Sequence, residues 1–384
     1  MRGQISVLLV FGTRPEAIKM APLVLALQRE KDLRPVVVVT GQHREMLDQV
    51  LDIFAIQPDY DLNIMRQGQT LTQVTNRVLA GLEEIMVEEN PDLVLVHGDT
   101  TTSMAAALAG YYAKRPIGHV EAGLRTNDKF NPYPEEMNRR ITGCLADLHF
   151  APTIMAKENL LAENIPSAGI FVTGNTVVDA LHHVVSQDQR FSDSSLEQLI
   201  DPSCRTILLT AHRRESWGQG LEQIFEAVKS IIKEFTDIQV IFPVHRNPQV
   251  MEQAMRAFRD VERVCLIEPP AYSDFARLLQ RAYLVMTDSG GIQEEAPGLN
   301  VPVVVLRNTT ERPEGVVSGN LVLAGTEREN IYREVSAILQ DEERHHKMAS
   351  APNPYGDGKA SERIKDAIYY YFNKTPHRPE DYRI

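Results

Sequence analysis

Two acidic residues, Asp99 and Glu121, lie at the ends of short apolar segments of the sequence, 93–97 and 117–121. Segments of this length that are rich in β-branched and aliphatic residues favour buried β-strands. Because the carboxyl ends of parallel strands meet at one edge of a sheet, we expect both carboxylates to lie in the same cleft, where each could act as a general acid or base. Simpler structural roles exist for both: Asp99 could cap the helix that follows it, and Glu121 could pair with Arg125.

The segment PYPEEMNRR, which starts at residue 132, is predicted to begin a helix. Its spacing places Glu135 four residues before Arg139 and Glu136 four residues before Arg140, so that each pair can form an ion pair on the helix surface. Ion pairs of this kind are common and contribute little to stability. The spacing alone therefore favours a structural role, although this helix must lie near the same strand ends.

A loop with the sequence GTRPEAIK follows the first predicted strand. Gly12 suits a tight bend, and Pro15 suits the first turn of a helix. Exposed backbone N–H groups at such a helix start, together with Arg14 and Lys19, could bind a phosphate. The alternative is an ordinary strand-to-helix turn with charged residues on its surface.

A cluster of basic residues follows two predicted strands in the second half of the chain, 206–210 and 239–243. Its members are His212, Arg213, Arg214, His245 and Arg246. In a chain with an excess of acidic residues, such a cluster indicates a local anion site that is suited to a diphosphate.

The segment DSGGIQEE at 288–295 ends another predicted strand and begins a helix. Gly290 and Gly291 would let backbone N–H groups approach a phosphate at the helix start. Either Glu294 or Glu295, one turn into the helix, could accept hydrogen bonds from ribose hydroxyls. The segment therefore indicates half of a nucleotide site, and the alternative is a tight turn whose acidic residues are favoured by the helix dipole.

All these segments follow predicted strands that alternate with helical segments, which is typical of parallel sheets with crossover helices. The strands are predicted at 5–11, 36–40, 93–97, 117–121, 148–151 and 170–173, and then at 206–210, 239–243, 264–267, 284–288 and 301–306. The pattern predicts an α/β protein with two doubly wound Rossmann-like domains facing a cleft. We place the first domain at 1–175, the second at 176–360, and a C-terminal helix and tail, which could pack back on the first domain, at 361–384.

The composition excludes several classes of protein. The chain has 384 residues, of which 43% are hydrophobic and 24% charged, as in an ordinary globular protein. Its net charge of -12 is the wrong sign for binding nucleic acid through a broad basic face. No apolar stretch is long enough to cross a membrane and no export signal is evident, so we expect a cytoplasmic protein.

Cofactor motifs are missing from the sequence. The three cysteines, Cys144, Cys204 and Cys265, are far apart and form no C-x-x-C pair, so neither a disulfide framework nor a zinc site is predicted. Neither G-x-G-x-x-G nor G-x-x-x-x-G-K-[ST] occurs, which argues against a bound nicotinamide and against P-loop chemistry. We therefore expect no cofactor and no metal.

Several of these segments together resemble the bacterial non-hydrolysing UDP-N-acetylglucosamine 2-epimerase family. The matching segments run in order from residue 12 to about residue 315: GTRPEAIKMAPL, HGDTTTS, HVEAGLRT, PYPEEMNRR, TAHRRES, PVHRNP, DSGGIQEEAP and RNTTERPEG. The resemblance implies a glycosyltransferase-B arrangement of the two domains. It also implies a homodimer that interconverts UDP-N-acetylglucosamine and UDP-N-acetylmannosamine without nicotinamide or metal.

The resemblance also implies roles for individual residues. The catalytic group implied in this way consists of Lys19, Asp99, Glu121, Glu135, Arg139 and His212. The residues implied to bind UDP are Arg14, Ser289, Gly290, Gly291, Glu295 and Arg312.

The expected chemistry follows from the weak acidity of the proton on C2 of an acetamido sugar. A carboxylate cannot remove this proton unless the carbon is first activated. Expulsion of UDP from C1 would acidify the proton and give a glycal, and UDP would then add back as a proton returns to the opposite face of C2. Two faces need two proton-handling positions or one mobile one, which suits several carboxylates in one cleft.

Three other functions are compatible with the same fold. A hydrolysing epimerase would release UDP and free N-acetylmannosamine, a glycosyltransferase would pass the sugar to an acceptor, and a nucleotide-sugar sensor would do neither. The intact carboxylates argue against a sensor, and the order of the segments argues against a transferase.

A second nucleotide-sugar site is also expected, because bacterial members of the family commonly use their own substrate as an activator. Some polar residues near the predicted strand ends exceed what one UDP-sugar requires. We predict that an activating UDP-N-acetylglucosamine would contact Gln42, His43, Glu136, Arg213 and His245. The alternative is that these are solvated loop residues.

Overall fold

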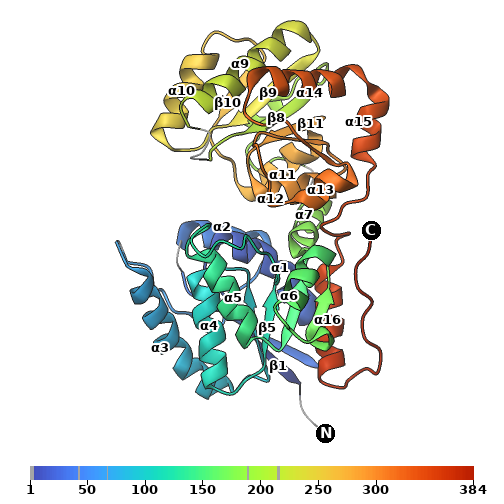
Figure 1. The fold of residues 1–384 in the computed structure, drawn as a ribbon. Coiled ribbons are helices and arrows are strands. Elements are labelled where there is room, and N and C mark those ends of the chain that lie inside the picture. The colour runs from blue at the N-terminus through green and yellow to red at the C-terminus, as the bar shows by residue number, and fades with distance from the viewer. Residues whose placement is uncertain (1–3, 42–43, 67, 188–189, 214–216) are drawn as a thin grey trace. The chain divides into compact units, whose positions relative to one another are not determined.

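The computed structural model describes residues 4–41, 44–66, 68–187, 190–213 and 217–384. The chain divides into two compact units (Figure 1). The first unit comprises Met1–Ala180 and Tyr355–Arg383, and the second comprises Leu181–Pro354 and Ile384. The chain thus leaves the first unit after residue 180 and returns to it at residue 355.

The first unit is built on a parallel sheet of seven strands in the order β3-β2-β1-β4-β5-β6-β7. Its strands are β1 (Ile5–Phe11), β2 (Leu33–Val39), β3 (Tyr60–Asp61), β4 (Leu93–His97), β5 (Ile117–Val120), β6 (Leu148–Ala151) and β7 (Ile170–Val172). Its helices are α1 (Arg14–Gln28), α2 (Arg44–Ile53), α3 (Leu71–Glu89), α4 (Thr101–Tyr112), α5 (Glu135–Leu145), α6 (Ile154–Ala162), the 3₁₀ turn η1 (Ser167–Gly169), the start of α7 (Thr176–Ser186) and α16 (Ala360–Tyr371).

The second unit is built on a parallel sheet of six strands in the order β10-β9-β8-β11-β12-β13. Its strands are β8 (Arg205–Thr210), β9 (Ile238–Pro243), β10 (Val264–Ile267), β11 (Leu284–Thr287), β12 (Val303–Val305) and β13 (Leu321–Leu323). Its helices, after the end of α7, are α8 (Ser195–Leu199), α9 (Gln219–Glu234), α10 (Pro248–Phe258), α11 (Tyr272–Arg281), α12 (Gly290–Gly298), α13 (Pro313–Ser318), α14 (Arg328–Gln340) and α15 (Glu342–Ala349).

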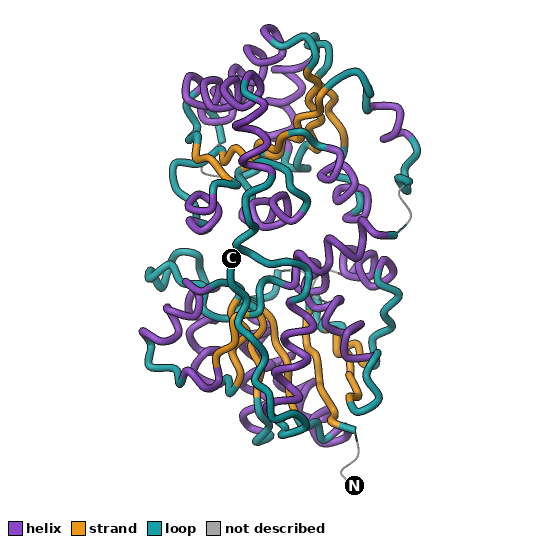
Figure 2. The backbone as a smooth tube through the Cα atoms, turned by 90° about the vertical axis from the view of Figure 1, so that its right-hand side faces the viewer, coloured by secondary structure: helices purple, strands orange, loops and turns teal. Residues whose placement is uncertain are grey.

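Each sheet lies between layers of helices, as Figures 1 and 2 show. In the first unit, α3 and α4 pack side by side and bury a core against β1, β2 and β4. In the second unit, α9, α10 and α14 cover one face of the sheet and form its main core. The central strands are buried on both faces, which explains why their sequences are continuous apolar runs rather than alternating ones.

The strand order reverses once in each sheet. In the first sheet the reversal lies between β1 and β4, and in the second it lies between β8 and β11. The loops that leave neighbouring strands at such a point run to opposite faces of the sheet and leave a crevice at the strands' carboxyl ends, where doubly wound proteins bind their ligands. We therefore expect a ligand site in the segments that follow β1, β4, β8 and β11.

The last helix, α16, belongs to the first unit, where it packs against α1. Lys365 Nζ lies 3.1 Å from Glu30 Oε1, and the Tyr369 hydroxyl donates to Glu30 Oε2 at 3.2 Å. Beyond this helix, the N–H of Tyr382 donates to the carbonyl of Val172 at 2.7 Å, so that the tail follows the outer edge of β7.

All eleven predicted strands occur, with bounds that differ from the predicted ones by a few residues at most. Two further strands, β3 and β13, were not predicted. None of the three cysteines, all of which lie in the described ranges, forms a disulfide. No helix within the described ranges is both long and apolar enough to cross a membrane.

Candidate functional site

The loop after β1 is organised by a buried glutamate, Glu16, which is 2% exposed. Its Oε2 accepts the backbone N–H groups of Gly12 and Thr13 at 3.0 and 2.8 Å, and the Thr13 hydroxyl caps the helix by accepting the N–H of Glu16. Its Oε1 accepts the hydroxyls of Thr100 and Ser103 at 2.6 and 2.8 Å. Glu16 therefore ties the loop after β1 to the loop after β4, on the two sides of the strand reversal.

This arrangement corrects one prediction. Exposed backbone N–H groups at the helix start were expected to be able to bind a phosphate, but the N–H groups of Gly12 and Thr13, just before the helix, are bound by the protein's own carboxylate. A buried anion at this position would also repel a phosphate placed there. Arg14 is the first residue of α1, directly after these two N–H groups.

Glu121 follows β5 and points to residues from three other elements. Its Oε2 forms an ion pair with Lys19 Nζ of α1 and accepts a hydrogen bond from Asn175 Nδ2 at 2.8 Å. The alternative partner, Arg125, instead forms a bidentate pair with Glu163 at 2.8 and 2.7 Å. The backbone of Glu121 has a φ of +61°, a left-handed conformation that is uncommon for residues other than glycine and is often found at functional sites.

His97, the last residue of β4, is a buried neutral group beside Glu121. Its Nε2 lies 3.7 Å from Glu121 Oε2, and neither ring nitrogen has a hydrogen-bond partner in the described structure. Burial lowers the pKa of His97, which outweighs the attraction of the Glu121, Glu16 and Asp99 carboxylates, while Lys19 lowers it further. The carboxylates of Glu121, Glu16 and Asp99 therefore all act electrostatically on one buried imidazole.

A second buried histidine, His119 of β5, supports the same region. Its Nε2 lies 2.7 Å from the carbonyl oxygen of Gly98, the residue before Asp99. Burial lowers the pKa of His119 to about 3, so the ring is neutral at physiological pH and its Nε2–H can donate to that carbonyl. His119 thereby helps to hold the loop that carries Asp99.

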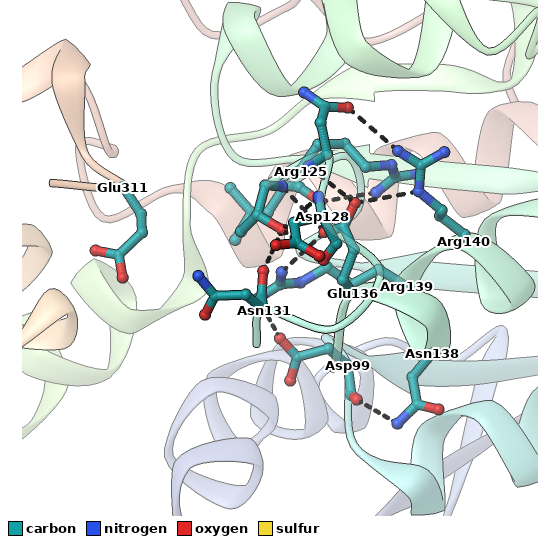
Figure 3. A network of polar contacts seen from close by, with 12 residues as sticks. Asp99, Arg125, Asp128, Asn131, Glu136, Asn138, Arg139, Arg140 and Glu311 are labelled. Carbon is teal, nitrogen blue, oxygen red and sulfur yellow. Dashed lines mark hydrogen bonds and ion pairs between the residues drawn. The ribbon is translucent and has the colours of Figure 1, made fainter. Parts of the chain in front are cut away.

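Asp99 is held by two residues of α5 (Figure 3). Its Oδ2 lies 2.5 Å from an Nη atom of Arg139, and its backbone carbonyl accepts a hydrogen bond from Asn138 Nδ2 at 2.9 Å. The cap of α4 is supplied by Thr100, whose hydroxyl accepts the N–H of Ser103 at 3.1 Å. The Asp99 side chain therefore pairs with a cation instead of capping the helix.

Glu136 is fully buried and organises the start of α5 (Figure 3). Its carboxylate accepts the backbone N–H groups of Thr126 and Asn127 and pairs with Arg140 at 3.1 Å and Arg139 at 3.4 Å. Burial would raise the pKa of Glu136, but these hydrogen bonds outweigh it and hold the pKa below its usual range. The Glu136/Arg140 pair predicted from spacing is thus present, whereas Arg139 turns to Asp99 and Glu136.

Glu135 begins α5 and differs from the other carboxylates in its surroundings. Its Oε2 is buried and has no hydrogen-bond partner among the described residues. Buried polar atoms almost always have a partner, so one without a protein partner calls for an explanation such as a bound water or ligand.

In the second unit, Asp288 links the two strand ends at the point of reversal. The residue is fully buried, and its Oδ2 accepts the backbone N–H groups of His212 and Arg213, each at 2.8 Å. Its Oδ1 lies 3.2 Å from His212 Nδ1. Burial would raise the pKa of Asp288, but its contacts with His212 and the N–H of Arg213 hold it below the usual value. The segment after β8 is thus fixed to the segment after β11.

His212 stacks on His245, with ring centroids 5.6 Å apart and an angle of 14° between the rings. Burial and the neighbouring His212 lower the pKa of His245. Arg213 lies 3.8 Å from a carboxylate oxygen of Glu311, which also pairs with Arg307 at 2.5 Å. Four of the five members of the predicted basic cluster lie in the described residues: His212 and Arg213 follow β8, and His245 and Arg246 follow the neighbouring strand β9. Arg246 lies 3.7 Å from a carboxylate oxygen of Glu268, and Arg214 lies outside the described residues.

The start of α12 has the form of a phosphate site. Ser289 is the N-cap residue, and its side chain makes no capping hydrogen bond. A Cβ atom on Gly290 would lie 3.7 Å from Arg213 Nη2, which places that guanidinium beside the helix start. An uncapped helix N-terminus next to an arginine favours an anion.

The two glutamates of α12 have different partners. Arg312 forms an ion pair with Glu294, whereas Glu295 accepts a hydrogen bond from the Tyr272 hydroxyl at 3.3 Å. Arg312 is thus brought to the helix through Glu294.

Two of the predicted activator contacts, Gln42 and His43, lie outside the described residues. Within the described ranges, no group of three or more His, Cys, Asp or Glu side chains is placed to hold a metal ion. A groove of about 810 Å³ between α3 and α4 has an apolar lining that includes Leu79, Met86 and Val87, and none of the predicted site residues line it.

Glu16, Asn175 and Asp288 organise the site but were not among the predicted site residues. Asp288 comes directly after β11, and Asn175 comes shortly after β7. Both could have been predicted, because residues that follow parallel strands commonly form the ligand site. Glu16 carries the signal of a capping box, with Thr13 three residues before it.

Comparison with known proteins places this arrangement in a family. Residues 25–369 match the family model described as UDP-N-acetylglucosamine 2-epimerase. The chain is 52% identical over 379 residues to the UDP-N-acetylglucosamine 2-epimerase of Bacillus subtilis, covering 99% of each chain.

Solved structures are similar over nearly the whole chain. A putative UDP-N-acetylglucosamine 2-epimerase from Listeria monocytogenes superposes with a TM-score of 0.94 at 54% identity and 100% coverage of both chains. The UDP-GlcNAc 2-epimerase from Neisseria meningitidis, solved bound to UDP-GlcNAc, has a TM-score of 0.86 at 46% identity, with 95% of this chain and 99% of that one covered.

The chain belongs to the UDP-N-acetylglucosamine 2-epimerase family, a family of isomerases. Its two parallel α/β sheets form a glycosyltransferase-B-like fold, as the sequence predicted.

Proposed function

We propose that this protein interconverts UDP-N-acetylglucosamine and UDP-N-acetylmannosamine by eliminating UDP, retaining a glycal, and adding UDP back. One observation carries the proposal: Glu121 and Asp99 follow adjacent strands of one sheet, and each is held by a cation, Lys19 and Arg139 respectively. Oriented carboxylates of this kind suit proton transfer at a carbon atom.

In the elimination, a base removes the proton on C2 while the bond between C1 and the diphosphate oxygen breaks. The electron pair of the C2–H bond forms the C1–C2 double bond, and the diphosphate oxygen keeps the pair of the C1–O bond. In the addition, UDP attacks C1 and a proton is delivered to the other face of C2. Each direction therefore consumes and returns one proton, and no oxidant is needed.

The residues of the first unit handle protons in this proposal. Glu121 and Asp99 are the acid and base candidates, and Glu135 is the third, because its buried Oε2 has no partner in the described structure. Lys19 and Arg139 hold the first two carboxylates in place. Arg139 also contacts the buried Glu136, which limits the directions in which its guanidinium can turn.

The residues of the second unit bind UDP in this proposal. The start of α12 at Ser289, Gly290 and Gly291 binds the diphosphate, with His212 beside it, and Glu295 binds the ribose. Positive groups that are fixed before the reaction stabilise the charge that builds on the leaving diphosphate. Asp288 fixes both the backbone of His212 and its ring. Arg14 in the first unit and Arg312, held by Glu294, complete the set that we assign to UDP.

A proton NMR time course of UDP-N-acetylglucosamine with the protein tests this function against its rivals. We expect signals of UDP-N-acetylmannosamine to grow to a constant ratio with the substrate. Accumulation of UDP and free N-acetylmannosamine would instead indicate a hydrolysing epimerase. Turnover only with an added acceptor would indicate a glycosyltransferase, and binding without turnover would indicate a sensor.

We also propose that UDP-N-acetylglucosamine activates the enzyme at a second site to which Arg213 and His245 contribute. Arg213 and His245 lie beside the residues that we assign to UDP. They support a second site, because one diphosphate does not require so many basic groups. Of the other predicted contacts, Glu136 is buried under two arginines, so we expect it to act through Arg139 and Arg140.

An activator that binds the active state more tightly shifts the enzyme toward that state. The rate of the reverse reaction, which starts without UDP-N-acetylglucosamine, should therefore depend on whether this activator is added. With pure UDP-N-acetylmannosamine as substrate, we expect a lag that a trace of UDP-N-acetylglucosamine removes. Gln42→Ala should weaken this activation and leave the affinity of the catalytic site for UDP nearly unchanged. Immediate hyperbolic kinetics that do not respond to added UDP-N-acetylglucosamine would contradict the second site.

The assembly that we propose is a homodimer in the cytoplasm. The groove between α3 and α4 supports a surface for self-association, because Val87 and Tyr112 in its lining are 80% and 68% exposed. Light scattering of the purified protein measures the mass directly, and the same measurement on Val87→Asp shows whether this groove is the interface.

A further inference from the structure

The carboxylate of Glu121 is held by a buried amide as well as by Lys19. Asn175 Nδ2 donates to Glu121 Oε2 at 2.8 Å, and Asn175 is 2% exposed. A hydrogen bond to a charged group is stronger than one between neutral groups, and burial keeps water from competing for it. This contact joins residues 54 positions apart in the chain.

The orientation of the Asn175 amide is fixed by a second hydrogen bond. Its Oδ1 accepts the backbone N–H of Val177 at 3.1 Å, at the start of α7. Because an amide oxygen can only accept and an amide nitrogen can only donate, this contact leaves Nδ2 as the group that faces Glu121. The side chain is therefore set as a donor to the carboxylate.

The backbone of Asn175 is held by the segment where the chain returns to the first unit. Its N–H donates to the carbonyl of Tyr355 at 2.6 Å, and Tyr355 is 1% exposed. Gly174 and Gly356 permit this close approach, since a Cβ atom on Gly174 would lie 3.2 Å from Gly356 Cα. Gly174 also has a φ of +83°, which favours glycine.

We propose that Asn175 is a positioning residue for Glu121, and that the returning segment at Tyr355 and Gly356 holds it in place for this task. The inference rests on the role of Glu121 in the proposed function. A second observation supports it independently: the left-handed backbone of Glu121 is maintained only if its surroundings fix it. Lys19 places a positive charge beside Glu121 Oε2, and the hydrogen bond from Asn175 fixes the orientation of the carboxylate.

Titratable groups from several elements surround this region. Lys19 of α1 pairs with Glu121, and the neutral His97 of β4 lies beside it. Glu16 of α1 and Asp99 of the loop after β4 act electrostatically on the same His97. A carboxylate in place of the Asn175 amide would add a negative charge at hydrogen-bond distance from Glu121. A like charge this close disfavours ionisation of its neighbour.

The substitution Asn175→Asp tests the inference, because aspartate can still cap α7 by accepting the N–H of Val177. We expect the acidic limb of the pH profile of kcat/KM to move to higher pH by about one unit or more. Asn175→Ser keeps a capping hydroxyl but is too short to reach Glu121. We expect it to lower kcat by about tenfold or more, with KM and the melting temperature close to those of the unchanged protein.

Asp179→Asn in the same helix is the matched control. Asp179 accepts the backbone N–H groups of Ala360 and Ser361 at 3.1 and 2.7 Å, so this variant weakens the packing of α7 on α16 without touching Glu121. We expect a lower melting temperature and an unchanged acidic limb. A shift of the limb in Asp179→Asn equal to that in Asn175→Asp would overturn the inference, because general loosening of α7 would then explain both.

Two further outcomes separate the inference from the proposed function. An unchanged acidic limb in Asn175→Asp, or an unchanged kcat in Asn175→Ser, overturns the positioning role while Glu121→Gln remains inactive and the function stands. Full activity of Glu121→Gln would instead remove the role of Glu121 itself, and the inference with it.

Discussion

Glu121→Gln is expected to lower kcat by about 10²-fold or more and to leave the affinity for UDP within about threefold of its original value. Glutamine has nearly the shape of glutamate, and its amide oxygen can still accept the hydrogen bond from Asn175. What it loses is the ability to take up and return a proton. Asp99→Asn should have an effect of the same order, because the amide cannot exchange a proton either. Steady-state kinetics and UDP titration by calorimetry measure the two quantities.

A matched variant in the second unit should show the opposite pattern. Glu295→Ala is expected to weaken UDP binding, since we assign this carboxylate to the ribose. Comparing the two kinds of variant guards against a general loss of structure. If Glu121→Gln and Glu295→Ala lost UDP affinity equally, the carboxylates of the first unit would have a structural role and the division of tasks would be wrong.

The fold was predictable because buried parallel strands leave a strong local signal. β1 and β4 are continuous apolar runs, and each is followed by a segment of helical pattern. The two strands that the sequence analysis missed are short and lie at or near sheet edges: β3 has two residues and β13 has three. Segments this short contain too few residues to show a period, and only their neighbours in the folded sheet define them.

The sequence could suggest candidate residues for the site but not the contacts that hold them. Asp99 and Glu121 could be selected because they follow strands. The partners that hold them could not, since Lys19 lies 102 residues from Glu121 in the chain and the spacing of α5 favoured Glu135 as the partner of Arg139. Helical spacing describes which side chains can meet on one helix, whereas Arg139 meets Asp99 across the end of the sheet.

The loop after β1 shows why a motif can suggest the wrong ligand. Its glycine, its proline and its helix start are all typical of a phosphate site. The same segment carries Glu16, and in the folded protein that carboxylate turns back to bind the loop's own N–H groups. The capping box at Thr13 and Glu16 uses N–H groups that an anion would otherwise bind, so these donors are not available to a phosphate.

The fate of the proton on C2 tests the elimination and addition of UDP most directly. If a base removes this proton and an acid returns one to the other face, the proton exchanges with solvent. We expect UDP-N-acetylmannosamine formed in deuterium oxide, without added nicotinamide, to carry deuterium at C2. The measurement is the loss of the C2 proton signal by NMR, together with a gain of one mass unit for deuterium in place of hydrogen. Product that keeps its original hydrogen at C2 would contradict the mechanism.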